Sequence, residues 1–201
     1  MFPPHDDPRG ACVLAALLGE EPSRSGQDWP QGFEGGLAHR LDVPTSGALL
    51  CADDPEELVE IRDAFASGAF TKVYRFVAGR EVSWDDHACD CSIAHHRRRR
   101  DRMVVQRGKD TAHRGRWYPA HTTFRRVEGA LFEAVIVTGV THQIRVHAAF
   151  LGIALRGDRL YGGGAPGEGR PAEAPFQLHH LGLSGAGFQT DPVPRPDWVT
   201  A

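Results

Sequence analysis

The sequence predicts a single α+β domain, and two observations support this prediction. At 201 residues the chain is long enough for one sizeable core and short for two ordinary domains. Segments with the alternation of strands and segments with the periodicity of helices are interspersed without strict alternation. Such an order favours an α+β arrangement over a doubly wound sheet.

The first 52 residues predict a helix, a loop and a strand. The apolar segment ACVLAALLG is expected to be a short helix that ends at Gly19. Residues 20–38 are rich in Gly, Pro and Ser and show no period, so they are expected to form a loop. The apolar run GALLCA, residues 47–52, predicts a buried strand.

The clearest helix follows directly. Asp54 stands at the N-cap position, Pro55 at the first helical position, and Gly68 closes the segment. Its apolar positions fall on one stripe, as in an amphipathic helix. They are Leu58, Ile61 and Phe65.

Two strands and a third helix are expected in the second half of the chain. Residues 71–81 alternate, which places Lys72, Tyr74 and Phe76 on one face of a strand. Residues 131–139 predict a more buried strand. A helix is expected to begin at a Thr141 cap and to end at Gly152, with an inner stripe that leaves Arg145 out. That stripe is Ile144, Ala148 and Leu151.

The C-terminal part predicts less regular structure. Residues 162–175 have the composition of a flexible loop, and residues 176–201 indicate a strand pair followed by a Pro-rich end. No run of 18 or more apolar residues occurs, and the opening residues lack a secretory pattern, so a cytoplasmic protein with no membrane contact is expected. The four cysteines are expected to be reduced thiols. They are Cys12, Cys51, Cys89 and Cys91.

Charge is distributed unevenly along the chain. The net charge of −3 argues against a protein that coats nucleic acid indiscriminately. Residues 95–126, however, carry 11 basic and 2 acidic side chains, and all but one of these cations are Arg, which suits bidentate phosphate contact. An Arg-rich codon bias contributes to this composition, but the clustering predicts a surface for RNA or phosphate. Its densest part is Arg97, Arg98, Arg99 and Arg100.

Several motifs, taken together and in this order, resemble the RluA-type family of RNA pseudouridine synthases. The motifs are HRLDVPTSG from His39, the Lys-x-Tyr of TKVY, GVTHQIRVH from Gly139, GIALRGDRLYGG and LHHLGL. The resemblance runs from His39 to the C-terminus. It implies a pseudouridine synthase-like mixed, mostly antiparallel sheet with flanking helices and a central catalytic cleft over residues 39–201, preceded by a divergent segment of helix and loop over residues 1–38.

The resemblance also implies a reaction and the residues that perform it. A uridine in structured RNA, ribosomal or transfer, would have its base detached from C1′, turned and rejoined through C5. Asp42 matches the catalytic Asp, as nucleophile or as base, and Arg145 matches its ion-pair partner. A nearby cation favours the ionised carboxylate that either role needs. Tyr74 matches the residue that stacks on the flipped uracil, and Arg40 the residue that enters the RNA where the base has left.

Other motif positions receive no derived role. His39, His142 and Gln143 are grouped with the RNA-binding residues, although a hydrogen-bonded structural role is favoured for the histidines, including His147. The resemblance implies no cofactor, no metal and no obligatory protein partner. A zinc site remains an alternative, although its Cys-x-Cys spacing fits poorly. Its ligands would be Cys89, Cys91, His95 and His96.

Two departures from the family pattern keep a second function open. Val140 stands where the family usually has Arg or Lys, and the first residues do not reproduce the Lys-Pro-x-Gly turn that follows the family's first strand. Either that strand is therefore expected to be absent or the gene start is misplaced, and no S4-like RNA-binding domain is evident. The rival hypothesis is a catalytically silent relative that binds or refolds RNA.

Overall fold

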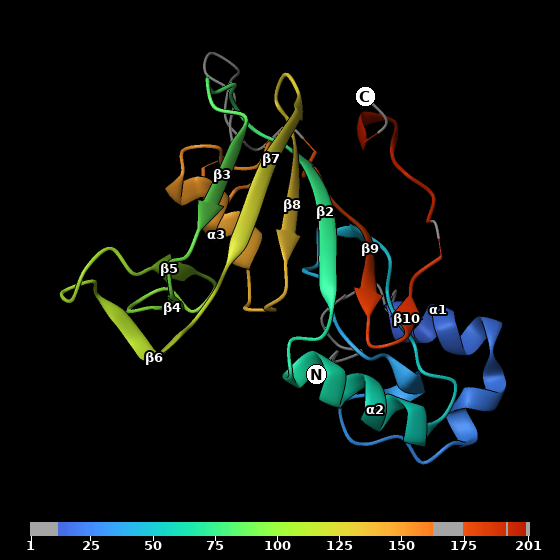
Figure 1. Cartoon of the computed structure of the whole chain (residues 1–201). Helices are drawn as coiled ribbons and strands as arrows, with labels where there is room; N and C mark the ends of the chain where they lie inside the picture. Colours follow the sequence, from blue (N-terminus) through green and yellow to red (C-terminus); the bar gives the residue numbers. More distant parts are fainter. Residues whose placement is uncertain (1–11, 163–174, 192, 200–201) are drawn as a thin grey trace.

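The computed structural model describes residues 12–162, 175–191 and 193–199, and a seven-stranded sheet forms its centre (Figure 1). The strand order is β1-β9-β2-β8-β7-β3, with β10 also paired to β9. Only β1 and β9 run parallel, so the predicted mixed, mostly antiparallel sheet is confirmed. The strands are β1 Ser46–Gly47, β2 Thr71–Val77, β3 Asp86–Cys89, β7 Thr122–Glu128, β8 Leu131–Ile136, β9 Leu178–Gly185 and β10 Phe188–Gln189.

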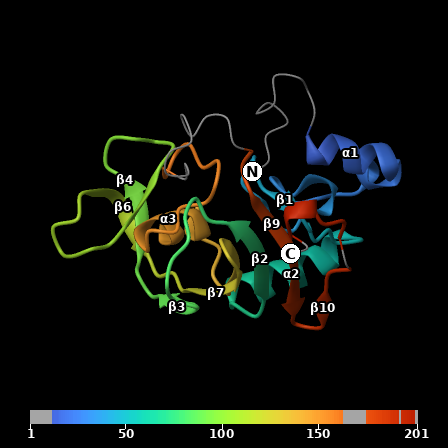
Figure 2. The same cartoon turned by 90° about the horizontal axis from the view of Figure 1, so that it is seen from above.

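A second, three-stranded sheet projects beside the main one. Its order is β5-β4-β6, with β4 Ile93–His96, β5 Met103–Val105 and β6 His113–Tyr118. Seen from above, β4 and β6 lie at one end of the molecule and the N-terminal helix α1 at the other (Figure 2). None of the strands between residues 86 and 128 was predicted from the sequence.

The helices flank the central sheet. They are α1 Val13–Glu20, α2 Pro55–Ala66 and α3 Gln143–Phe150, with short 3₁₀ turns η1 Pro22–Gly26, η2 Glu34–Gly36 and η3 Asp197–Val199. The Asp54 carboxylate caps α2 by accepting hydrogen bonds from the N–H groups of Glu56 and Glu57, as its sequence predicts. None of the helices in the described part of the chain is long and apolar enough to cross a membrane.

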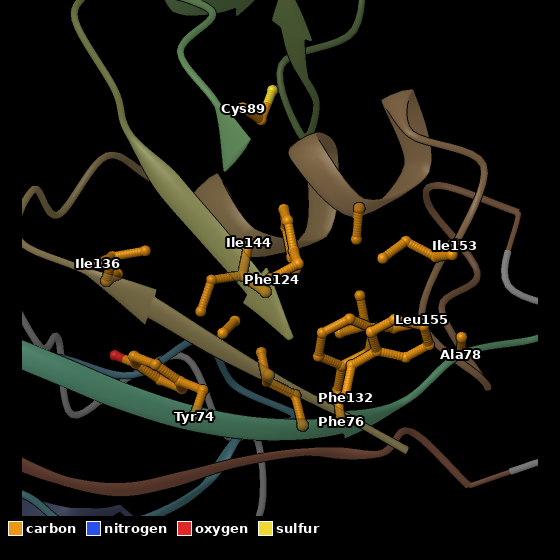
Figure 3. Packing of buried hydrophobic residues seen from close by; sticks show 13 residues of the cluster. Tyr74, Phe76, Ala78, Cys89, Phe124, Phe132, Ile136, Ile144, Ile153 and Leu155 are labelled. Atoms are coloured by element: carbon orange, nitrogen blue, oxygen red, sulfur yellow. The ribbon is translucent and has the colours of Figure 1, made fainter. Parts of the chain in front are cut away.

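The main core lies between α3 and the sheet. Figure 3 shows Ile144 of α3 together with Phe124 and Phe132 of the neighbouring strands, while Tyr74 stands at the edge of this cluster. A second cluster joins α2 to the sheet through Leu58 and Ile61, which are fully buried. Burying each of these side chains contributes about 1.5–3 kcal/mol.

Two details of the predicted elements are wrong. Residues 47–52 do not form a strand, since the pairing with β9 stops at Gly47 and only an isolated bridge joins Leu37 to Cys51. Helix α3 begins at Gln143 rather than at a Thr141 cap, because His142 adopts a left-handed conformation with φ of 56°. The predicted strands at β2, β8 and β9–β10 are confirmed, whereas most of the loop predicted at 162–175 falls outside the described residues.

Helix α3 is buried on more than one side, which the predicted inner stripe did not anticipate. Ile144 and Ala148 face the main sheet, while Val146 packs in the core of the small sheet. Arg145, predicted to lie off the inner stripe, is nevertheless only 5% exposed. The helix therefore connects the two sheets and places Arg145 inside the protein.

Candidate active site

A cavity of about 490 Å³ opens where the loop before β1, strand β2 and the start of α3 meet. Its size is in the range of pockets that hold small ligands. The predicted residues Asp42, Tyr74 and Arg145 all line it, together with Arg40 and His142. Side chains from three distant parts of the sequence therefore converge on one space.

Arg145 forms the electrostatic centre of this space. Its Nε and Nη2 donate to both oxygens of the fully buried Asp158, at 2.8 and 3.0 Å, and its Nη1 donates to Asp42 Oδ2 at 3.3 Å. Burial acts to lower the pKa of Arg145, but these two carboxylates outweigh burial and raise it. The guanidinium is thus a fixed cation beside Asp42.

Asp158 is the main residue that sequence reasoning missed. Its carboxylate also accepts from the backbone N–H groups of Leu160 and Tyr161, at 2.9 and 3.1 Å, which holds the turn in shape. Asp158 is part of the GDRLYGG motif, so the sequence did mark its position. Its role as the partner of Arg145 follows only from the contact in the structure. Asp42 differs from Asp158 because its side chain is 20% exposed and faces the cavity.

Tyr74 provides an aromatic wall. It is 8% exposed and stacks on His180 with ring centroids 4.4 Å apart and an interplanar angle of 24°. Burial, and next the charge of Asp42, raise the pKa of the phenol, so Tyr74 stays neutral and keeps its hydroxyl proton. Its hydroxyl points away from Phe76 and Phe132 (Figure 3).

Two neutral histidines lie close to Tyr74: His180 stacks on its ring, and His39 contacts His180 and lines the cavity. His39 Nε2 accepts a hydrogen bond from the Leu50 N–H at 3.0 Å, and His180 Nδ1 donates to the Ala48 carbonyl at 2.6 Å. Burial lowers the pKa of His39 to about 3 and that of His180 to about 4. The His180 contact fastens the segment that carries Asp42 to β9, and the His39 contact joins the two sides of that segment.

His142 lies close to Asp42. The Tyr161 hydroxyl accepts from the Met103 N–H at 2.9 Å and is also hydrogen-bonded to His142 Nδ1 at 2.9 Å. The other ring nitrogen, Nε2, is 3.9 Å from Asp42 Oδ2. Burial lowers the pKa of His142, which favours the neutral imidazole.

Gln143 and His147 are engaged by the protein. The Gln143 amide donates to the His121 carbonyl and to Thr122, and accepts from Thr138 and from the Val140 N–H. His147 bonds to Thr122 Oγ1 and to the Cys91 carbonyl, both at 2.9 Å. Both side chains are buried and brace the start of α3.

The predicted arginines lie at the surface. Arg40 is exposed and lines both the cavity and an adjoining hollow of about 820 Å³. All four arginines from Arg97 to Arg100 are exposed on the β4–β5 turn, and Asp101 of that turn lines the same hollow. The basic turn thus stands beside the entrance to the site.

Among the described residues, no group of three or more His, Cys, Asp or Glu side chains could hold a metal ion. The four cysteines belong to no disulfide.

Comparisons with known proteins agree on one family. The family profile described as RNA pseudouridylate synthase matches residues 19–150. The chain is 34% identical over 131 residues to "RNA pseudouridine synthase 2, chloroplastic" of Oryza sativa subsp. japonica, covering 64% of this chain and 29% of the relative. It is also 34% identical over 160 residues to "Ribosomal large subunit pseudouridine synthase D" of Nitrosomonas europaea, covering 77% and 42%.

Solved structures give the same result for the fold. The structure titled "Human RNA Pseudouridylate Synthase Domain Containing 1" matches with a TM-score of 0.65 at 24% identity, covering 80% of this chain and 68% of that one. "Human RNA Pseudouridylate Synthase Domain Containing 4" matches with a TM-score of 0.61 at 22% identity, covering 81% and 72%. The chain spans less than half the length of the curated relatives named above.

Proposed function

Because the chain belongs to the RNA pseudouridylate synthase family, we propose that it isomerises uridine in structured RNA to pseudouridine. The observation that carries the proposal is the 3.3 Å contact between Arg145 and Asp42 at a cavity walled by Tyr74. A partly exposed carboxylate beside a fixed cation is ready to react with a nucleotide that enters this cavity. The reaction needs no cofactor.

Each group has a proposed task. Asp42 acts on the flipped nucleotide as nucleophile or as base, and Arg145 keeps it ionised and oriented. Tyr74 stacks on the uracil and presents a neutral hydroxyl to it. Arg40 fills the gap that the base leaves in the RNA, which offsets part of the few kcal/mol that unstacking costs.

The same proposal assigns the RNA-contacting surface. The exposed turn from Arg97 to Arg100 binds phosphates next to the cavity, and residues 39–201 form the catalytic domain. His39, His142 and Gln143 shape the cavity through their hydrogen bonds to the protein. The substrate is ribosomal or transfer RNA. The name of the Nitrosomonas europaea relative supports ribosomal RNA as the first to test.

Tritium release from RNA labelled at uridine C5 tests the activity, since the C5 proton is lost only when C5 becomes bonded to C1′. The RNA is taken from cells that lack the protein, so that the target is unmodified. We expect release with the wild type and none with Asp42→Asn, which should still bind RNA. Asp63→Asn, on the exposed surface of α2, is the control and should release tritium like the wild type.

A catalytically silent RNA-binding protein is the second candidate. The replacement of the family's usual cation by Val140 favours it, because one positive charge is missing at the cavity edge. RNA binding without tritium release from any RNA would support this candidate and contradict the first. Full turnover by Asp42→Asn would contradict the role given to Asp42.

A further inference from the structure

Lys72 is a buried cation in the candidate active site to which no role has been assigned. It lies on β2 two residues before Tyr74, so both side chains are on the same face of the sheet. Its exposure is 6%, and it lines the cavity that Asp42 and Arg145 also line. Lysine is rarely buried to this extent without a partner of opposite charge.

The surroundings of Lys72 supply no such partner. Among the described residues its ammonium forms no ion pair and no hydrogen bond. The Phe65 ring centroid lies 5.4 Å from Nζ, and a Cβ added at Gly139 would lie 3.1 Å from it. The ammonium therefore lies against the ring of Phe65 and the backbone of Gly139, and it faces the cavity.

The titratable groups around Lys72 are uncharged or directed elsewhere. His39 and His180, on the two neighbouring segments, are neutral, and Tyr74 on the same strand keeps its proton. Asp42, His142 and Arg145 line the same cavity, where Arg145 is paired with the two carboxylates. Burial lowers the pKa of Lys72 to about 8, so most of the lysine is still protonated at pH 7.

We propose that the Lys72 ammonium donates a hydrogen bond to a carbonyl oxygen of the bound uracil and stabilises the negative charge on the base during glycosidic cleavage. The inference rests on the proposed function. Breaking the C1′–N1 bond leaves its electron pair on the uracil, where it is shared by N1, O2 and O4. The attraction between a fixed cation and one of these oxygens is stronger after cleavage than before, because the oxygen then carries more negative charge. Catalysis requires such an increase.

The remaining steps conserve every atom. The base turns, C5 forms a bond to C1′, C5 loses its proton, and N1 gains one, so that uridine and pseudouridine are isomers. Lys72 transfers no proton in this scheme. Its neighbours favour a base over a phosphate as the ligand, since the apolar side chains of Phe65, Ile136 and Leu178 line the same cavity and suit a flat ring.

The first test is the single-turnover rate of Lys72→Met at saturating labelled RNA. Loss of one preorganised donor predicts a rate roughly 100-fold lower, with the affinity for RNA changed only a few-fold. Arg75→Met removes a cation from the same strand but from its opposite face, where Arg75 bonds to the Val199 carbonyl, and should keep the wild-type rate. A rate for Lys72→Met within about threefold of the wild type would overturn the inference.

The pH dependence separates an electrostatic role from a merely structural one. At sub-saturating RNA, where the rate reports the free enzyme, the wild-type rate should fall above about pH 8 as Lys72 loses its proton, whereas the residual rate of Lys72→Met should lack this fall. Parallel profiles for the two proteins would contradict the proposal. If the wild type itself releases no tritium, the proposed function fails, and this outcome is distinct from a failure of the Lys72 variant.

A direct measurement avoids any dependence on how well the Lys72 variant folds. The chain contains two lysines, so NMR of protein labelled with ¹⁵N at the lysine side chains gives two ammonium signals, with exposed Lys109 as the internal reference. Binding of target RNA to Asp42→Asn should shift the Lys72 signal and raise its pKa. An unchanged Lys72 titration in the complex would overturn the inference.

Discussion

Arg145 and Asp42 are 103 positions apart in the sequence, and their side chains meet at 3.3 Å. The contact depends on a third residue, because Asp158 occupies the other two nitrogens of the guanidinium and leaves Nη1 to face Asp42. Asp158 thereby fixes the direction in which the buried cation acts. The buried Asp158 therefore determines where the positive charge of Arg145 meets Asp42 on the cavity side.

Asp158→Asn should therefore be strongly destabilising. It removes the buried carboxylate and leaves a guanidinium that is 5% exposed with Asp42 alone as its charged partner. Breaking a buried pair in this way costs about 3–5 kcal/mol, measured as the free energy of unfolding in denaturant. Asp85→Asn is the control, since Asp85 pairs with Arg126 at the surface and should cost less than about 1 kcal/mol. Equal losses in the two variants would contradict this prediction.

Gly47→Ala should be destabilising because the glycine of the Thr-Ser-Gly motif lies directly against the backbone of His180. A Cβ at Gly47 would lie 2.1 Å from the His180 carbonyl oxygen, and Gly47 has a φ of 116°. The clash would separate β1 from β9 and displace the loop that carries Asp42. We expect a loss of about 2 kcal/mol or more in unfolding free energy, together with reduced tritium release.

Gly19→Ala serves as the matched control for this substitution. Gly19 lies in α1 with nothing within 4 Å of an added Cβ, so alanine should stabilise the protein by about 0.5–1 kcal/mol. Thermal denaturation of both variants gives the comparison. A Gly47→Ala protein as stable as the wild type would show that the β1–β9 pairing is not needed.

Local patterns predicted the elements that have one buried face. In β2 the buried residues Lys72, Tyr74 and Phe76 alternate with partly exposed ones, and in α2 the stripe of Leu58 and Ile61 is fully buried. Both patterns follow directly from the period of the backbone. Sequence reasoning was reliable where burial is one-sided.

The edge strands β3 and β6 show no such pattern. In β3 three of four residues are exposed, and in β6 all six are exposed or only partly buried. Edge strands of this kind are held by backbone pairing rather than by an apolar face, so no periodicity marks them. The apolar run GALLCA led to the opposite error, because a strand was predicted where none forms. Ala48 and Ala52 are buried beneath neighbouring segments without belonging to a strand.

The site was predictable only as far as its motifs. Asp42, Tyr74 and Arg145 were expected together, and the structure brings them to one cavity. Asp158 was not expected, because its role arises from a contact with Arg145 that no local pattern encodes. The burial of Lys72 was visible in the alternation of β2, but the lack of a partner was not.

Acidification should destabilise the protein through its buried histidines. Burial lowers the pKa of His39 to about 3 and that of His180 to about 4, whereas the unfolded chain has a histidine pKa near 6.5. Below pH 6.5 the unfolded state binds more protons than the folded state. The contribution of these two histidines to the free energy of unfolding is therefore fully present above that pH and is lost as the pH falls toward 4. Each histidine contributes a slope of about 1.4 kcal/mol per pH unit in this window.

Denaturant unfolding at several values between pH 7.5 and pH 4.5 checks this dependence. His39→Gln retains an amide oxygen that can accept from the Leu50 N–H, and it cannot be protonated in this range. Its stability should therefore fall less steeply with acid than that of the wild type, by about 1.4 kcal/mol per pH unit. Identical slopes would show that His39 does not supply this sensitivity.

The basic turn beside the cavity should determine how RNA binding depends on salt. Arg97, Arg98 and Arg100 are exposed, whereas Arg99 donates to Asp101 at 3.1 Å and is partly neutralised. Each arginine that contacts a phosphate releases counterions, so replacing these three with Gln should make the log–log salt slope shallower by about 2–3. Affinity measured by fluorescence anisotropy at several salt concentrations gives that slope. Arg80→Gln is the control, because Arg80 bonds to the Gly152 carbonyl away from the cavity, and it should leave the slope unchanged. If the triple variant has the same slope as the wild type, this turn is excluded from the RNA interface.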